Sequence, residues 1–121
     1  MVRIKDMVRR SGETIASAEV EGVLNSHPDI LLSAVIAVPD HERGEEVKAY
    51  IQLRADVNEI QPQAILGFAS ERLAKFKVPR YLEFTTGFTF TPSERIVKRE
   101  LLARKDDQRQ GAFDAAVGQW R

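Results

Sequence analysis

The most regular pattern in the chain is an alternation of apolar and polar residues from Val47 to Arg54. Successive side chains of a strand point to opposite faces of a sheet, so this period of two predicts a strand with one buried face. Before it, residues 32–38 form an apolar stretch rich in branched side chains. Residues 39–44 then supply the proline, aspartate and glycine that are typical of a turn. The whole segment predicts a β-hairpin.

Apolar residues at helical spacing indicate helices elsewhere in the chain. The first is predicted over residues 17–27, with Ser17 as its N-cap and a proline directly after it. The second is predicted over residues 62–76 and has a proline in its first turn. Residues 96–105 predict a short third helix, and residues 113–120 place their apolar side chains on one helical face, which predicts a tail helix.

The remaining segments complete the expected fold. Residues 1–14 are polar and contain a glycine, which predicts a short hairpin or loop. Residues 81–84 predict another short strand, and residues 85–93 a surface loop. Because helices are interleaved with strands and a hairpin, we predict an α+β fold, a small sandwich in which helices cover a mainly antiparallel sheet.

Composition narrows the class of protein. A chain of 121 residues with 43% hydrophobic content has the size of one domain, so we expect residues 1–121 to form a single unit. The 18 Lys and Arg residues balance the 18 Asp and Glu residues, which leaves no overall field to attract nucleic acid or an anionic membrane. The longest apolar stretch, residues 30–38, is shorter than the ~20 residues of a membrane-spanning helix. We therefore expect neither a nucleic-acid partner nor a membrane span.

Candidate metal chemistry and export signals are weak in this sequence. The chain has no cysteine, which excludes a disulfide framework and a thiolate metal site and fits a cytoplasmic location. His27 and His41 have no second ligand at metal spacing, so no metal site is predicted. The charged N-terminus is not followed by the apolar region of a secretory signal.

Two segments far apart in the chain resemble one known family. Residues 3–8 read RIKDMV and are followed by Gly12, Ile15 and the triplet EVE at 19–21, while residues 91–101 read TPSERIVKREL. Both are similar to motifs of the adenylate-forming superfamily, which comprises acyl-CoA synthetases, peptide-synthetase adenylation domains and luciferases. Weaker similarities within residues 38–45 and 75–80 follow in the family's order. The resemblance covers residues 2–105 and implies the C-terminal lid domain of such an enzyme, most like an acyl-CoA synthetase.

The resemblance implies an acid–thiol ligase that works in two half-reactions. A carboxylate attacks ATP to give acyl-AMP and pyrophosphate, and then a thiol, usually that of CoA, displaces AMP. The lid rotates between them and presents a different loop for each. ATP, Mg²⁺, CoA and an organic acid are thus expected, with ATP and Mg²⁺ bound through a large N-terminal domain that would be the partner of this lid. The lid alone, with its tail at residues 106–121, is not expected to be active.

The sequence leaves the acid and some alternatives open. The Pro-Ser-Glu-Arg loop favours the carnitine and crotonobetaine CoA ligase branch. One rival is an adenylation domain that passes its acyl group to a carrier protein. Another is a free-standing interaction module that has kept the fold without catalysis.

The resemblance gives the N-terminal motif residues distinct roles. Arg3 stands at the position that contacts the nucleotide, where a guanidinium can bind ribose hydroxyls or phosphate. Lys5 and Asp6 stand at the hinge about which the lid turns, and Asp6 could cap nearby backbone N–H groups. A solvated surface side chain is the alternative for Arg3, and a plain linker lysine is the alternative for Lys5.

A second group is implied to serve the thioester step. Gly12 lies in the loop that lines the thiol channel, where a glycine lets the backbone come close to a ligand. Glu13 beside it could orient that loop, and Arg80 aligns with a basic position near the CoA phosphates. A turn glycine, a solvated glutamate and a surface arginine are the structural alternatives.

Arg95 is the most informative residue of the C-terminal motif. It stands where the family usually carries the lysine that bridges the substrate carboxylate, the ribose and the α-phosphate during adenylation, and Glu94 replaces the family's glycine. A glutamate at position 94 is expected to hinder a positive φ there. We expect Arg95 to act in place of the lysine, with Lys98 as a possible substitute and slow adenylation as a third possibility.

Overall fold

The computed structural model describes residues 7–57 and 60–121, so the predictions for Arg3, Lys5 and Asp6 lie outside the described residues. The strands are β1 (Met7–Arg10), β2 (Glu13–Ala16), β3 (Ile30–Asp40), β4 (Gly44–Leu53), β5 (Tyr81–Phe84), β6 (Phe113–Asp114) and β7 (Gln119–Trp120), and the helices are α1 (Ser17–Asn25), α2 (Pro62–Ser70), the 3₁₀ turn η1 (Lys75–Lys77) and α3 (Lys98–Ala103).

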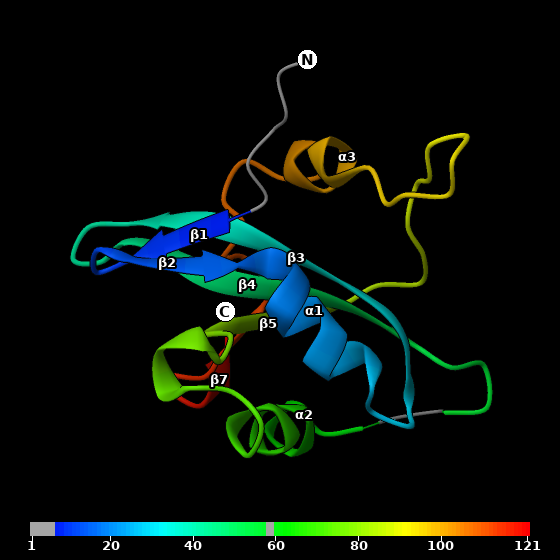
Figure 1. Cartoon of the computed structure of the whole chain (residues 1–121), viewed down its shortest axis with the longest axis horizontal. Coiled ribbons are helices and arrows are strands. Elements are labelled where there is room, and N and C mark those ends of the chain that lie inside the picture. Colours follow the sequence, from blue (N-terminus) through cyan, green and yellow to red (C-terminus); the bar gives the residue numbers. More distant parts are fainter. Residues whose placement is uncertain (1–6, 58–59) are drawn as a thin grey trace.

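The described strands form one sheet in the order β2-β1-β4-β5-β6-β7, with β3 also paired to β4. Every pairing is antiparallel except that of β4 with β5, which is parallel. Figure 1 shows α1 and α2 on one side of the strands and α3 on the other. This arrangement confirms the predicted α+β sandwich on a mainly antiparallel sheet.

The long hairpin of β3 and β4 confirms the β-hairpin that the sequence predicts around the turn at residues 39–44. Its register runs from Ile30 opposite Leu53 to Asp40 opposite Gly44. The Asp40 carboxylate closes the turn by accepting the N–H groups of Glu42 and Arg43 at 3.1 and 2.9 Å. An aspartate that hydrogen-bonds the backbone just ahead is a common way to nucleate such a turn.

The prediction that β4 buries only one face is wrong. Its odd-numbered residues pack under α1 and α2 with the main core, which includes Val35, Ala49, Leu24 and Ile65. Its even-numbered face is covered by α3 and the segment after it, so that Lys48 and Tyr50 are also fully buried. Polar residues on an alternating strand indicate solvent only when nothing covers their face, and here Leu101 of α3 packs against Tyr50.

The predicted tail helix is a two-stranded hairpin instead. Phe113 pairs with Trp120 across β6 and β7, and their rings lie 5.5 Å apart. Gly118 takes a φ of +70° in the turn between them, and Asp114 is fully buried at the end of β6. A buried ionised side chain at Asp114 fixes this segment to the sheet more specifically than an apolar stripe fixes a helix.

The other helices are shorter than predicted. Ser17 is the first residue of α1 and is buried, and Ala16 before it holds the N-cap position with no side-chain hydrogen bond. The second helix ends at Ser70, and the chain then continues to η1. The third spans only Lys98–Ala103. None of the helices in the described ranges has the length and apolar character to cross a bilayer.

Candidate functional site

The loop that carries Arg95 is a tight hairpin closed by its own hydrogen bonds. The N–H of Thr91 donates to the carbonyl of Arg95 at 2.8 Å, and the N–H of Arg95 returns to the Thr91 hydroxyl at 3.1 Å. The N–H of Glu94 donates to the Thr91 carbonyl at 2.9 Å, and Phe90 bridges to Ile96 beyond the loop. The 91–95 loop, as we call it, is therefore shaped by its own sequence.

Glu94 adopts a positive φ of +66° in this loop. The expectation that glutamate would hinder this conformation is therefore wrong, although the conformation is still strained. A residue with a Cβ in the left-handed region loses about 1–2 kcal/mol relative to its ordinary conformation. The loop keeps the backbone shape that a glycine would adopt freely.

Replacing Glu94 with glycine is expected to stabilise the domain by about 0.5–1 kcal/mol. The strain of ~1–2 kcal/mol disappears, and the greater freedom of glycine in the unfolded chain offsets ~0.5–1 kcal/mol of that gain. Urea unfolding of this 121-residue chain measures the difference. Ser93→Gly is the matched control, since Ser93 is an exposed neighbour without positive φ, and it should not stabilise. A loss of stability in Glu94→Gly would contradict the strained loop.

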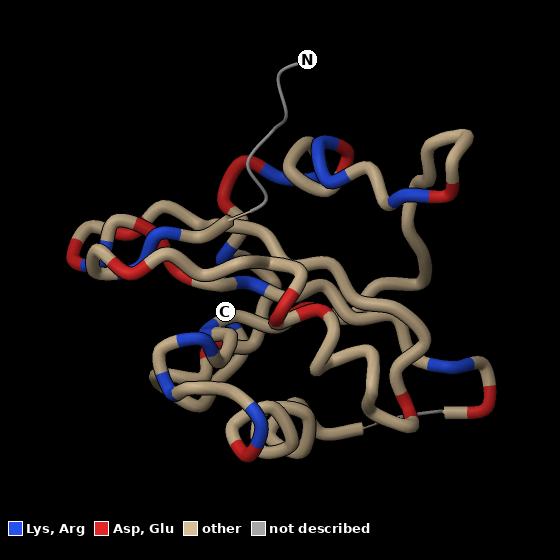
Figure 2. The backbone as a smooth tube through the Cα atoms, in the orientation of Figure 1, with Lys and Arg blue, Asp and Glu red and all other residues tan. Residues whose placement is uncertain are grey.

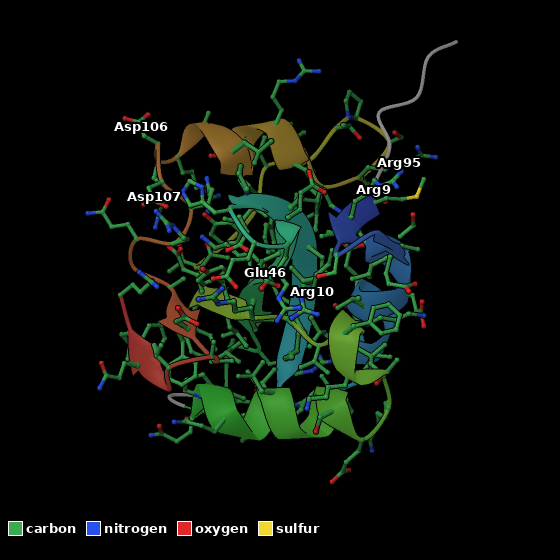
Figure 3. The ribbon with its side chains drawn as sticks, turned by 90° about the vertical axis from the view of Figure 1, so that its left-hand side faces the viewer. Arg9, Arg10, Glu46, Arg95, Asp106 and Asp107 are labelled. Carbon is green, nitrogen blue, oxygen red and sulfur yellow. The ribbon has the colours of Figure 1, made fainter. Side chains whose placement is uncertain are left out.

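Arg95 itself is exposed. Figure 3 shows it at the edge of the molecule, on the side of Arg9 and away from Asp106 and Asp107. Among the residues that the structure describes, no carboxylate lies within ion-pair distance of its guanidinium. A charged side chain in this setting is available to an anionic ligand.

Lys98 has a carboxylate partner close by. Its ammonium lies 2.6 Å from the carboxylate of Glu21 in α1, and both side chains are partly buried. The same Glu21 oxygen accepts the backbone N–H of Val35 in β3 at 2.8 Å. The two resembling motifs, far apart in the sequence, are thus in contact through this ion pair.

Gly12 lies at the turn of the β1–β2 hairpin. It has a φ of +82°, and Ser11 before it has a φ of +53°. A Cβ added at Gly12 would meet no atom within 4 Å, so the need for glycine comes from the backbone and the backbone is open to solvent. The turn is anchored by the Ser11 N–H, which donates to the Arg43 carbonyl at 2.8 Å. Glu13 follows, exposed at the start of β2.

Arg80 is surrounded by carboxylates. Its guanidinium lies 3.1 Å from Asp114, 3.5 Å from Asp40 and 3.5 Å from Glu46. The hydrogen bonds that Arg80 donates to Asp114 raise the pKa of Arg80 despite partial burial. Burial acts to raise the pKa of Asp114, but hydrogen bonds from Arg80 and Arg121 hold it below the ordinary range. This arrangement gives Arg80 a structural role in holding the tail hairpin to the sheet.

The residues that were predicted to serve the thioester step are connected through Glu46. This buried carboxylate accepts the Arg10 guanidinium at 2.6 Å and also faces Arg80 at 3.5 Å (Figure 3). Arg10 ends β1 directly before the Gly12 turn. The structure therefore brings Arg80 and the Gly12 hairpin into one ion-pair network.

The structure does not bring Gly12 and Arg95 together. In Figure 1 the β1–β2 turn lies at the left-hand end of the molecule and the 91–95 loop at the upper right, with the start of β1 between them. Acidic and basic residues both occur in the turns at the left-hand end of the chain trace (Figure 2). The Gly12 turn and the 91–95 loop therefore lie on different sides of the domain.

One polar cluster was missed by sequence reasoning. Lys48 is fully buried, and its ammonium donates to Glu83 at 2.8 Å, to the Tyr50 hydroxyl at 3.1 Å, and to the backbone and side-chain oxygens of Gln108 at 2.6 and 3.0 Å. Burial lowers the pKa of Lys48, which Glu83 opposes, and burial raises the pKa of Tyr50 to about 12. The alternating pattern gave no signal for this cluster, because it places lysine on a solvent face.

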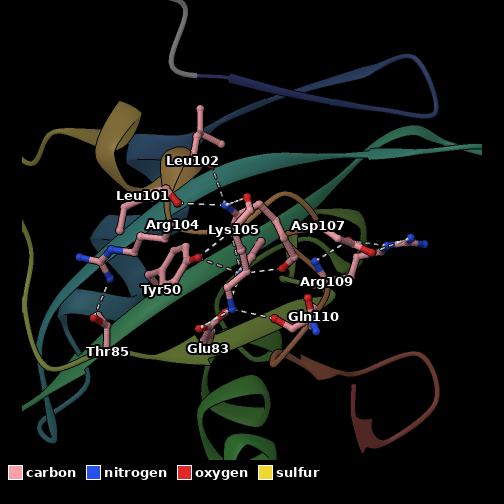
Figure 4. Close-up of polar contacts among 12 residues, drawn as sticks. Tyr50, Glu83, Thr85, Leu101, Leu102, Arg104, Lys105, Asp107, Arg109 and Gln110 are labelled. Carbon is pink, nitrogen blue, oxygen red and sulfur yellow. Dashed lines mark hydrogen bonds and ion pairs between the residues drawn. The ribbon is translucent and has the colours of Figure 1, made fainter.

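Gln108 connects this cluster to α3. Its amide donates to the carbonyl of Leu101 at 2.9 Å, while its side-chain oxygen accepts the Tyr50 hydroxyl at 2.6 Å (Figure 4). Lys105 also reaches Glu83 at 2.9 Å. The cluster thus fixes α3, the helix after the 91–95 loop, to the sheet.

The described residues offer little to a metal ion. No group of three or more histidine, aspartate or glutamate side chains in the described ranges is arranged to hold one. The His27 ring nitrogen accepts the N–H of Asp29 at 3.0 Å, and its ring packs on Phe68.

Comparison with known proteins finds one matching family and several similar proteins. The family described as AMP-binding enzyme C-terminal domain matches residues 19–95. The medium-chain acyl-CoA ligase ACSF2, mitochondrial, of Danio rerio is 39% identical over 106 residues, which cover 88% of this chain and 17% of that protein. The crotonobetaine/carnitine–CoA ligase of Proteus mirabilis is 38% identical over 96 residues, which cover 79% of this chain and 18% of that protein. The chain thus spans less than a fifth of the length of these relatives.

Solved structures give the same result for the fold. The Mycobacterium tuberculosis fatty acyl CoA synthetase superimposes with a TM-score of 0.74 at 33% identity, over 82% of this chain and 19% of that one. A double mutant of o-succinylbenzoate CoA synthetase from Bacillus subtilis, bound to a product analogue, gives a TM-score of 0.76 at 30% identity, over 87% of this chain and 21% of that one. The resemblance stated from the sequence motifs is confirmed.

Proposed function

Because this chain belongs to the family of AMP-binding enzyme C-terminal domains, we propose that residues 1–121 are the lid domain of an ATP-dependent acid–CoA ligase. The complete enzyme would form acyl-AMP and then acyl-CoA, with a large N-terminal domain as the partner of this lid. The names of the relatives, which are acyl-CoA and carnitine ligases, support this proposal. Their range of acids leaves both a fatty acid and a carnitine-type acid as candidate substrates.

One observation carries the proposal: the Gly12 turn and the 91–95 loop lie at different ends of the domain, the turn at the left-hand end of the sheet and the loop outside the sheet at the upper right (Figure 1). A single active site cannot contact both ends at once. A rotation near Lys5 and Asp6 would present them in turn, which is how one small domain could serve two half-reactions. The proposed hinge and the proposed nucleotide contact of Arg3 precede the described residues.

In the adenylation pose, Arg95 would face the oxygens that gain negative charge. ATP supplies the α-phosphate that the acid attacks, and Mg²⁺ would be held by the N-terminal domain. The exposed guanidinium of Arg95 fits this role, because no described carboxylate neutralises it and the closed loop behind it fixes its base. Arginine keeps the charge of the family's lysine but spreads it over a planar fork.

In the thioester pose, the Gly12 turn would form one wall of the channel for the CoA thiol. Its open backbone allows a ligand to approach closely, and Glu13 would lie at the edge of that wall. We keep a CoA-phosphate contact for Arg80 as part of this proposal. Since Arg80 is paired with Asp114, Asp40 and Glu46, it would act through the one-quarter of its side chain that is exposed, 24%.

Replacing Gly12 with alanine in the complete ligase is expected to slow thioester formation about tenfold and to leave pyrophosphate release unchanged. A residue with a Cβ costs ~1–2 kcal/mol at this positive φ, which lowers the population of the native turn about tenfold. The two half-reactions are measured separately, as pyrophosphate release and as acyl-CoA formed from preformed acyl-adenylate.

Gly118→Ala is the matched control for this experiment. Gly118 has a similar φ of +70° and also has no atom within 4 Å of an added Cβ, but it lies in the tail hairpin. It should share the backbone strain without slowing either half-reaction. Equal slowing of thioester formation by both variants would contradict the role of the Gly12 turn. Pyrophosphate release with no transfer to CoA, but with transfer to a carrier protein, would favour the peptide-synthetase alternative. Absence of both reactions would favour the interaction module.

A further inference from the structure

The position of Arg95 depends on how α3 is held. Only Ile96 and Val97 separate Arg95 from Lys98, the first residue of α3. The N–H of Val97 donates to the carbonyl of Thr89 at 2.8 Å, which fixes the base of the 91–95 loop. Any shift of the helix start therefore moves the loop with it.

The far end of α3 is held to the sheet. Leu101 is fully buried against Ala34, Ile36 and Tyr50. Gln108 then caps the helix by donating to the Leu101 carbonyl at 2.9 Å. These contacts fix the end of the helix that is remote from Arg95.

The near end is held by the Glu21–Lys98 ion pair. The carboxylate of Glu21 is itself oriented, because the backbone N–H of Val35 donates to it at 2.8 Å from β3. The Lys98 ammonium approaches the same oxygen at 2.6 Å, and the two side chains are only 24% and 18% exposed. A charge-assisted contact to an anchored carboxylate defines a direction as well as a distance.

We infer that Glu21 and Lys98 are positioning residues for adenylation: their ion pair connects α1 to the start of α3 and so sets where Arg95 points. Lys98 then acts through Arg95 and does not substitute for it at the nucleotide. This inference rests on the proposed function. It assigns a role to Glu21 of the EVE triplet at residues 19–21, for which the motif resemblance alone gave none.

Glu21→Gln and Lys98→Met, made separately in the complete ligase, test this inference. Each is expected to lower the kcat of pyrophosphate release about tenfold, because a misplacement of ~1 Å at a reacting group can reduce the rate by up to ~100-fold. Thioester formation from preformed acyl-adenylate should stay within twofold of the wild type, because the Gly12 turn is remote from the pair. Lys98→Arg, which keeps the ion pair, should recover most of the adenylation rate.

Three results would overturn the inference. The first is slow adenylation in Lys98→Met together with a normal rate in Glu21→Gln, which would make Lys98 a direct ligand of the substrate. The second is equal slowing of both half-reactions, which would indicate a general loss of structure. The third is unchanged adenylation in both variants. A wild-type enzyme that releases no pyrophosphate would instead overturn the proposed function, and this separates the two failures.

Discussion

Replacing Lys48 with alanine is expected to lower the free energy of unfolding by about 3–5 kcal/mol, the range found when one partner of a buried ion pair is removed. The ammonium is fully buried and donates to Glu83, Tyr50 and both oxygens of Gln108. Alanine would remove the ammonium from all of them, although Glu83 keeps Lys105 and the Gln108 side-chain oxygen keeps Tyr50, and it would open a cavity on the α3 side of the sheet. Urea unfolding of the chain, followed by circular dichroism, measures the loss.

Lys105→Ala is the matched control for Lys48→Ala. Lys105 contacts the same Glu83 carboxylate at 2.9 Å, but its side chain is 22% exposed, so its removal should cost about 1 kcal/mol or less. Lys48→Met, which keeps most of the volume, should fall between the two. Equal losses for Lys48→Ala and Lys105→Ala would contradict the view that the buried cluster holds α3 in place.

Replacing Arg95 with alanine in the complete ligase is expected to slow pyrophosphate release about 100-fold. Removing one preorganised donor that faces a developing negative charge typically costs ~3 kcal/mol in the barrier. Thioester formation from preformed acyl-adenylate should be unaffected, because the proposed rotation would turn Arg95 away from the site in that step. Single-turnover assays of each half-reaction measure the two rates independently.

Two variants sharpen the Arg95 experiment. Arg99→Ala removes another exposed arginine, four residues further along, and should leave pyrophosphate release unchanged. Arg95→Lys restores the residue that the family usually carries and should give at least the wild-type rate. A normal rate in Arg95→Ala would remove Arg95 from the mechanism.

The local parts of the fold could be predicted from the sequence. The β3–β4 hairpin is encoded by alternation and by Asp40 in its turn, and β5 occupies the predicted residues 81–84. In both cases the sequence pattern lies in the same few residues that form the element. The short hairpin or loop predicted within residues 1–14 is also found in the described part, where β1 and β2 turn at Gly12.

The predictions that were wrong concern structure that depends on contacts between residues far apart in the sequence. The solvent face expected for Lys48 is covered by Gln108, which lies 60 positions further along the chain. The apolar stripe of residues 113–120 fits a helix or a hairpin equally well. The hairpin is favoured by Asp114, whose carboxylate accepts hydrogen bonds from Arg80 and Arg121. No local sequence pattern predicts hydrogen-bond partners that lie so far apart in the chain.

The separation of the Gly12 turn from the 91–95 loop has a consequence for how the domain can change. Substitutions at sites that share no neighbours usually add in free energy, so the Gly12 turn and the 91–95 loop form independent modules. A lineage could alter the loop around Glu94 and Arg95 without re-optimising the turn at Gly12. The unusual Glu-Arg pair in place of Gly-Lys is the kind of divergence that this modularity permits, and a grafted family loop should function here without compensating changes elsewhere.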